Sequence, residues 1–160
     1  MKRIKKFAFW ATTLLLAAVI LNVAAHAADV QSGTWKMNPA KSKYSPGPAP
    51  KELTVKVEVD DKGVKVDVTG TGADGTPTHV QYNAKFDGKD YPVTGLPYAD
   101  TVMVQKIDAN TIQSTLKKGG QVMMTVKSTV SPDGKTRTTT FTGKDAQGNA
   151  VNNVVVYDKQ

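Results

Sequence analysis

The feature that most constrains this chain is the alternation of apolar and polar residues that recurs beyond residue 50. Every second residue is apolar from 53 to 59, and the same spacing returns from 64 to 68 after a turn at 60–63. A period of two places successive side chains on opposite faces of a strand, so each strand has one apolar and one polar face. A series of such hairpins must close or stack to bury its apolar faces.

This pattern predicts about ten strands joined by turns rich in Gly, Asp and Asn. The predicted strands span residues 33–37, 53–59, 64–68, 80–86, 91–93, 100–107, 111–117, 121–130, 135–142 and 151–158. Nearly all connections have hairpin length, which leaves no room for crossover helices. We therefore expect an all-β fold, an antiparallel up-and-down β-barrel of about 8–10 strands, with a two-sheet sandwich as the alternative.

One connection differs from the others. Residues 38–50 form a longer loop, in which four prolines are expected to block any ladder or helix.

The composition agrees with a β fold that relies on its core. Residues 29–160 contain 18 Val and 17 Thr but only three Leu and two Ile. Val and Thr suit a half-buried pleated surface, whereas a helical domain of this size would rely on Leu. The chain has no Cys, so disulfides contribute nothing and the hydrophobic core must hold the fold alone.

Residues 1–28 have the layout of a secretory signal peptide. Four Lys and Arg residues precede residue 7, an apolar stretch follows to about residue 23, and Ala25-His26-Ala27 supplies the small residues of a cleavage site before Ala28. The rival interpretation is a permanent membrane anchor, but the uninterrupted apolar run 14–21 is short for a span of about 20 residues. The sequence predicts bacterial export to the periplasm or the medium, with a single barrel domain over residues 29–160.

The charge of the predicted mature chain is small and scattered. Four of the 21 Lys and Arg residues lie in residues 1–28, which leaves 17 against 14 Asp and Glu, a net charge of +3. These charges alternate with Val on the outer faces of strands, as in Lys56-Val57-Glu58. We therefore expect no nucleic-acid partner, and membrane contact only through the uncleaved signal peptide.

Catalytic and metal-binding patterns are sparse. The predicted mature chain has one His, His79, whose place beside Val80 favours an outward-facing surface residue. A general base needs a partner and an orienting group, and no nucleophile elbow or phosphate loop occurs. The Asp residues sit in turns without the spacing of a calcium loop, and one His without Cys disfavours zinc. We expect no enzymatic activity, no cofactor and no metal, with a barrel-scaffolded enzyme as the least favoured hypothesis.

The two ends of the predicted barrel carry a family resemblance. The run Gly33-Thr34-Trp35-Lys36-Met37 resembles the opening Gly-x-Trp of the calycin superfamily, which includes the lipocalins and the fatty-acid-binding proteins. The ending Val156-Tyr157-Asp158-Lys159 is similar to the last strand of fatty-acid-binding proteins. The resemblance implies a lipocalin-like barrel in which Gly33 and Trp35 are structural and Trp35 packs at the closed end.

The chain also departs from these families. The Arg that holds the lipid carboxylate in fatty-acid-binding proteins lies two residues before the Tyr of the last strand, where this chain has Val155. The helical lid is replaced by the loop 38–50, the second lipocalin motif is absent, and Lys159 is the residue that could replace the Arg covering the Trp. Residues 35–48 also resemble small secreted bacterial proteins without a known activity.

Aromatic and Met side chains are the candidates for a ligand pocket. Several share an apolar strand face or flank a loop, and thioethers suit an adaptable pocket. The candidate ligand-binding residues are Tyr44, Tyr82, Phe86, Tyr98, Met103, Met124, Arg137 and Phe141. Ser114 and Ser128 share faces with apolar residues, so an interior position would imply hydrogen-bond partners, water or a cavity. The alternative is that all these side chains simply fill the core.

Arg137 is the only Arg after residue 28. It shares a strand face with Thr139 and Phe141, but its position near a strand end favours an outward orientation. An inward Arg137 would be a buried cation that needs an anion from the protein or from a ligand.

Two functions remain open. One is an exported, non-catalytic barrel that binds a small apolar or amphipathic ligand. The other is a filled-core structural or protein-interaction module of the bacterial envelope, which contacts its partners through its loops. An internal void below roughly 300 Å³ would favour the second.

Overall fold

The structure, a computed structural model, describes residues 29–145 and 147–160, and these form a closed antiparallel β-barrel. The ten strands are β1 (Gly33–Met37), β2 (Glu52–Val59), β3 (Gly63–Thr71), β4 (Pro77–Lys85), β5 (Tyr91–Thr94), β6 (Thr101–Lys106), β7 (Thr111–Lys118), β8 (Gln121–Val130), β9 (Thr136–Lys144) and β10 (Ala150–Lys159). Each lies within a few residues of its predicted span, because alternation and turn chemistry are local signals.

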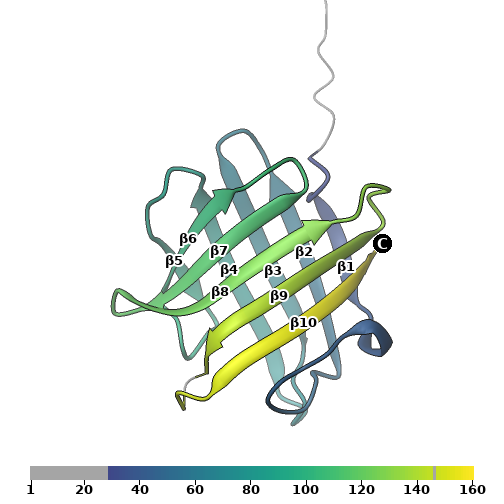
Figure 1. The fold of residues 1–160 in the computed structure, drawn as a ribbon, viewed down its shortest axis with the longest axis vertical. Coiled ribbons are helices and arrows are strands. Elements are labelled where there is room, and N and C mark those ends of the chain that lie inside the picture. The colour runs from purple at the N-terminus through teal and green to yellow at the C-terminus, as the bar shows by residue number, and fades with distance from the viewer. Residues whose placement is uncertain (1–28, 146) are drawn as a thin grey trace, which may run out of the picture.

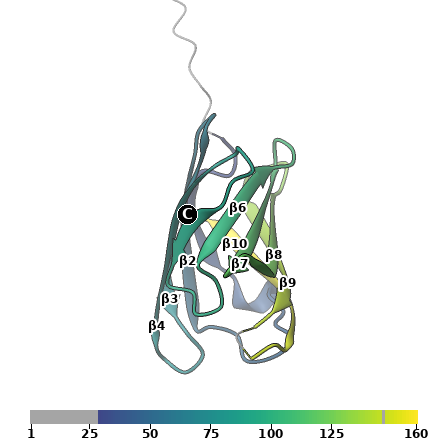
Figure 2. The same cartoon turned by 90° about the vertical axis from the view of Figure 1, so that its left-hand side faces the viewer.

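The strands follow one another around the barrel in chain order. Every strand pairs antiparallel with its sequence neighbours, and β1 pairs with β10 to close the wall, with Trp35 opposite Lys159 and Met37 opposite Tyr157. Figures 1 and 2 show β7–β10 forming one side of a flattened barrel and β1–β4 the other. The up-and-down barrel is therefore confirmed, and the sandwich alternative is wrong.

Because the strands alternate in direction, the connections alternate between two ends of the barrel. Residues 29–32 and the turns after β2, β4, β6 and β8 lie at one end, called here the Trp35 end. The loop 38–51 and the turns after β3, β5, β7 and β9 lie at the other, called here the loop end. This division decides which residues can close the interior and which can admit a ligand.

The Trp35 end is closed by buried side chains. Trp35 is 0% exposed, and its indole Nε1 donates a hydrogen bond of 2.9 Å to the carbonyl oxygen of Gln31. Gln31 is equally buried, and its Nε2 donates to the carbonyl oxygens of Asn110 at 2.5 Å and Ser128 at 3.4 Å. The Lys159 ammonium lies 4.9 Å from the centroid of the Trp35 ring, a cation–π contact. The expectation that Lys159 covers the Trp is confirmed.

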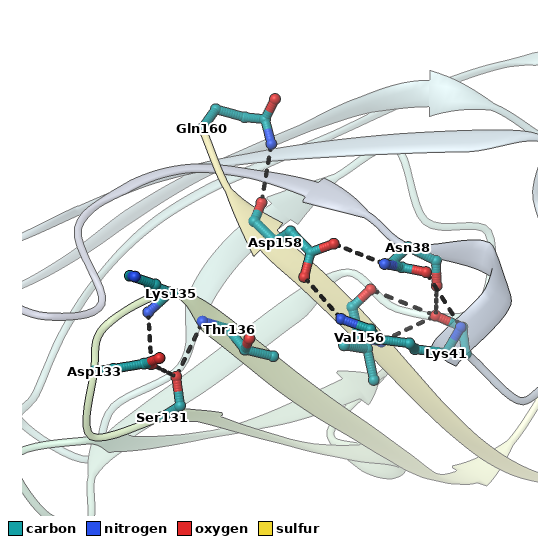
Figure 3. Close-up of polar contacts among 10 residues, drawn as sticks. Asn38, Lys41, Ser131, Asp133, Lys135, Thr136, Val156, Asp158 and Gln160 are labelled. Atoms are coloured by element: carbon teal, nitrogen blue, oxygen red, sulfur yellow. Dashed lines mark hydrogen bonds and ion pairs between the residues drawn. The ribbon is translucent and has the colours of Figure 1, made fainter.

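The loop 38–50 is partly regular, so the expectation that its prolines block any ladder or helix is wrong. Pro39–Lys41 form a short 3₁₀ turn, because Pro is tolerated at the start of a helical turn. Asn38 Nδ2 donates to Asp158 Oδ2 at 2.7 Å, which fixes this turn against β10 (Figure 3). Lys43 then pairs with Val154 through two backbone hydrogen bonds of 2.7 and 2.8 Å. The loop thus extends the barrel wall along β10 beyond the end of β1.

The core consists of the inward faces of the strands. It is rich in Val, and one Trp and one Tyr are its largest members.

The strand pairing in the barrel wall is shortest at β5, which pairs over two residues with each neighbour. There Gly95 has φ +83° and lies so close to β4 that an added Cβ would be 1.8 Å from the carbonyl oxygen of His79.

The predicted signal peptide, residues 1–28, lies outside the described residues. Within residues 29–160, apart from residue 146, no helix is long and apolar enough to cross a membrane.

Candidate functional site

The barrel encloses a cavity of about 250 Å³. Most of its wall is apolar, with Val side chains from β2, β3 and β4 facing Ile112 and Leu116 of β7. Toward the loop end it is lined by Pro50, Leu53 and Leu96. The alternation that defined the strands thus places their apolar faces around a hollow interior.

The part of the wall formed by β7–β10 also contributes polar groups. Ser114, Ser128, Arg137 and Thr139 line the cavity, and Tyr157 does so from the neighbouring strand. The hydroxyls of Ser128 and Thr139 lie 3.0 Å apart and form a buried hydrogen bond. The cavity therefore combines an apolar wall with a small polar group, which is the usual composition of a ligand pocket.

The turn between β8 and β9 fixes the beginning of β9. Ser131 Oγ accepts the backbone N–H of Thr136 at 3.0 Å, and Asp133 Oδ1 accepts that of Lys135 at 3.1 Å (Figure 3). Thr136 is thereby held on the outer side of the strand, and alternation turns Arg137 inward. Arg137 lies opposite Tyr157 of β10 and opposite Val130 of β8.

Arg137 is a buried cation, so the outward orientation favoured by the sequence is wrong. Its exposed fraction is 6%, and its Nη1 has no hydrogen-bond partner among the described residues. The residues lining the cavity include no Asp or Glu. Burial lowers the pKa of Arg137, while its interactions with Tyr82 and Tyr157 act in the opposite direction. A guanidinium nevertheless stays protonated in proteins, so the charge is retained in the cavity.

The tyrosines near the cavity are held in their neutral form. Burial raises the pKa of Tyr157, with Tyr44 adding to the effect and Arg137 opposing it. Burial also raises the pKa of Tyr82, against the opposing effects of Ser114 and Arg137, and raises that of Tyr98. A neutral phenol can donate a hydrogen bond as well as accept one.

A second cavity, of about 310 Å³, lies beneath the loop 38–50. It shares Leu53, Tyr98, Phe141 and Tyr157 with the first cavity and is otherwise lined by residues of the loop end. Tyr44 closes it from the loop, with its hydroxyl 3.1 Å from the sulfur of Met37. Burial raises the pKa of Tyr44 to about 12.

Six of the eight candidate residues line one of these two cavities. They are Tyr44, Tyr82, Tyr98, Met124, Arg137 and Phe141. Phe86 and Met103 line neither of them. Phe86 follows β4 at the Trp35 end and packs against the core, and Met103 lies on the face of β6 opposite the buried Val102 and Val104. The thioether of Met103 suits a pocket, but the alternation of β6 places this residue outside.

Two residues that matter for the cavity were not among the candidates. Tyr157 shares the inward face of β10 with Val151 and Val155, and this alternation could have identified it. Gln31 precedes the first strand, and no pattern in the sequence marks it as the residue that seals the Trp35 end.

The remaining chemistry lies outside the barrel. His79 is exposed, with its Nε2 3.4 Å from Asp67 Oδ2, so its outward orientation is confirmed. Among the described residues, no group of three or more His, Asp or Glu side chains could hold a metal ion. The chain matches no protein-family model, and no curated protein matches it.

Proposed function

We propose that this protein is an exported, non-catalytic barrel that binds one small amphipathic ligand in its interior. The observation that carries this proposal is the cavity of about 250 Å³, with its mostly apolar wall and its few polar side chains. Burial of the apolar part of the ligand would supply most of the affinity, at roughly 25 cal/mol per Å². The polar groups would orient the ligand.

A non-catalytic role agrees with the side chains around the cavity. Its titratable groups are Arg137 and three Tyr residues, and no carboxylate or imidazole lines it. Acid–base catalysis near neutral pH needs a group that titrates there. The signal-peptide pattern of residues 1–28 supports export to the periplasm or the medium.

The resemblance to calycins supports a carrier-like role. The closed barrel, the Gly33-x-Trp35 opening and the cation of Lys159 above the indole are in keeping with a calycin-like barrel. Binding of small apolar molecules is what that resemblance implies. The position occupied by the carboxylate-binding Arg of fatty-acid-binding proteins is Val155 here, so the polar contacts would differ.

The size of the cavity favours a second candidate. A volume of about 250 Å³ lies just below the roughly 300 Å³ at which small-molecule pockets begin. In this alternative the interior takes no ligand, and the protein is a structural or interaction module that contacts its partners through its loops.

A titration followed by NMR distinguishes the two candidates. The protein is expressed as the full chain, purified after export, and titrated with a panel of fatty acids, retinoids and uncharged analogues. Binding predicts saturable shifts of the methyl signals of Ile112, Leu116 and Val66. If no compound shifts them, the ligand-binding proposal is wrong.

Two variants of β8 provide the matched control. Val126→Phe places a ring in the cavity, whereas Thr125→Phe places one on the opposite face of the same strand. The first should abolish the saturable shifts and the second should leave them unchanged. Under the alternative, neither variant has binding to lose, and Val126→Phe should stabilise the barrel by filling a void.

A further inference from the structure

We infer that the cavity selects a ligand with a single carboxylate, which binds the guanidinium of Arg137, while its apolar body extends toward the loop end. This inference rests on the proposed function and names the chemical class of its ligand. It depends on the charge, the burial and the position of Arg137.

The charge of Arg137 requires a counter-charge. Its side chain is 94% removed from water, its Nη1 is unpaired, and no acidic residue lines the cavity. A buried charge without a partner is strongly unfavourable, and an anion at hydrogen-bonding distance offsets much of that cost. One cation balances one negative charge. A carboxylate satisfies this balance, whereas a phosphate monoester carries about −1.5 to −2 at neutral pH.

Neighbouring hydroxyl groups can complete a carboxylate site. Tyr157 lies directly across from Arg137 in the β9–β10 register, and both line the cavity. Ser128 and Thr139 share one hydrogen bond, which uses one of their two hydroxyl hydrogens. The second hydroxyl hydrogen can be donated to a ligand. A carboxylate has two oxygens that each accept more than one hydrogen bond, so it suits this set of donors.

The position of Arg137 sets the direction of the ligand. Arg137 is the second residue of β9, near the turn at the Trp35 end, and that end is sealed by Trp35 and Gln31. The lining at the loop end is mainly apolar, with Leu53 and Leu96 beside the hydroxyl groups of Thr78 and Tyr98. The ligand therefore enters with its carboxylate first and leaves its apolar part toward the loop end.

Calorimetric titration with matched ligands tests the inference. Octanoate, octyl phosphate and 1-octanol share one chain and differ in the charge of the head group. We expect wild-type protein to bind octanoate most tightly. In Arg137→Met, octanoate affinity should fall roughly 30-fold or more, the cost of removing one partner of a buried charged pair, while 1-octanol affinity should stay the same or rise.

Lys135→Met provides the control for charge alone. Lys135 is exposed in the adjacent turn, so its loss changes the net charge equally without touching the cavity. It should leave octanoate binding unchanged. If 1-octanol binds as tightly as octanoate to the wild type, or if Arg137→Met retains the octanoate affinity, the inference is wrong. Tighter binding of octyl phosphate would assign the site to a dianion instead of a carboxylate.

A measurement on the unmodified protein covers the case in which the Arg137 variant does not fold. The chain contains two Arg residues, and Arg3 lies in the predicted signal peptide. The guanidinium Nε–H signal of Arg137 in ¹⁵N-labelled protein is therefore easy to assign. It should shift with octanoate and remain in place with 1-octanol. Methyl shifts with both compounds and no change at Arg137 would overturn this inference while keeping the proposed function.

Discussion

Replacing Arg137 with Met should stabilise the ligand-free protein. The side chain is 6% exposed, with an unpaired Nη1 and no carboxylate in the cavity lining. Replacement of buried ionic groups by apolar residues of similar volume has stabilised proteins by about 1–4 kcal/mol. Met keeps an unbranched apolar stem in the same space, so little packing is lost. For a domain of this size the gain corresponds to a rise in Tm of roughly 3–15 °C.

Thermal unfolding followed by circular dichroism measures this effect, on protein freed of bound ligand by unfolding and refolding. Arg137→Lys keeps the charge and should show no comparable gain. Thr138→Met, on the outer face of the same strand, controls for a general effect of Met on β9. A folded Arg137→Met protein with an unchanged or lower Tm would refute the reasoning, because Arg137 would then contribute more through its contacts than its burial costs.

Three further predictions concern the closed Trp35 end, the wall at β5 and the loop 38–50. Trp35→Phe removes the indole hydrogen bond of 2.9 Å to a buried carbonyl and should cost about 1–3 kcal/mol in urea unfolding; no change would mean that water replaces the bond. Gly95→Ala should cost about 3 kcal/mol or more, because its Cβ would lie 1.8 Å from a β4 carbonyl oxygen. Gly88→Ala, at φ +73° with nothing within 4 Å, should cost only about 1–2 kcal/mol. Equal losses of stability in the two variants would contradict a close approach of Gly95 to β4. Burial raises the pKa of Tyr44 from 10.0 to about 12, because the ionised form is disfavoured in the folded state. Tyr44 therefore contributes at most about 2–3 kcal/mol to the free energy of unfolding below pH 10, and this contribution is lost as the pH rises to about 12. Tyr44→Phe should flatten that fall in urea midpoints measured between these pH values, and an unchanged slope would exclude Tyr44 as its cause.

The strands could be predicted from the sequence because their signals are local. Alternation between 53 and 59 and the turn at 60–63 need only neighbouring residues to be recognised. Closure of the barrel could also be predicted, because hairpin-length connections leave few arrangements for the first and last strands. The same alternation places Ser114 and Ser128 on faces shared with apolar residues, and both line the cavity.

Residue type and chain position are weaker signals than alternation. A thioether favours a pocket for Met103, although Val102 and Val104 occupy the inner face of β6. A position near a strand end favours an outward Arg137, yet Arg137 shares a face with Phe141, which lines the cavity.

Long-range pairing was harder to predict. The contact of Lys43 with Val154 joins residues more than a hundred positions apart, and no local pattern encodes it. Gln31 seals the barrel through the carbonyl oxygens of Asn110 and Ser128, which lie 79 and 97 positions away in the chain.

The seam between β1 and β10 has a consequence for the order of events in the cell. The pairs that close the wall join residues 35–37 to residues 157–159, so the barrel is incomplete until the last residues of the chain are available. Contacts of such high sequence separation form slowly. If the protein is exported as proposed, strand β1 crosses the membrane before its partner β10, and the barrel stays open until translocation ends. Premature termination before β10 would leave two unpaired strand edges, which favour aggregation.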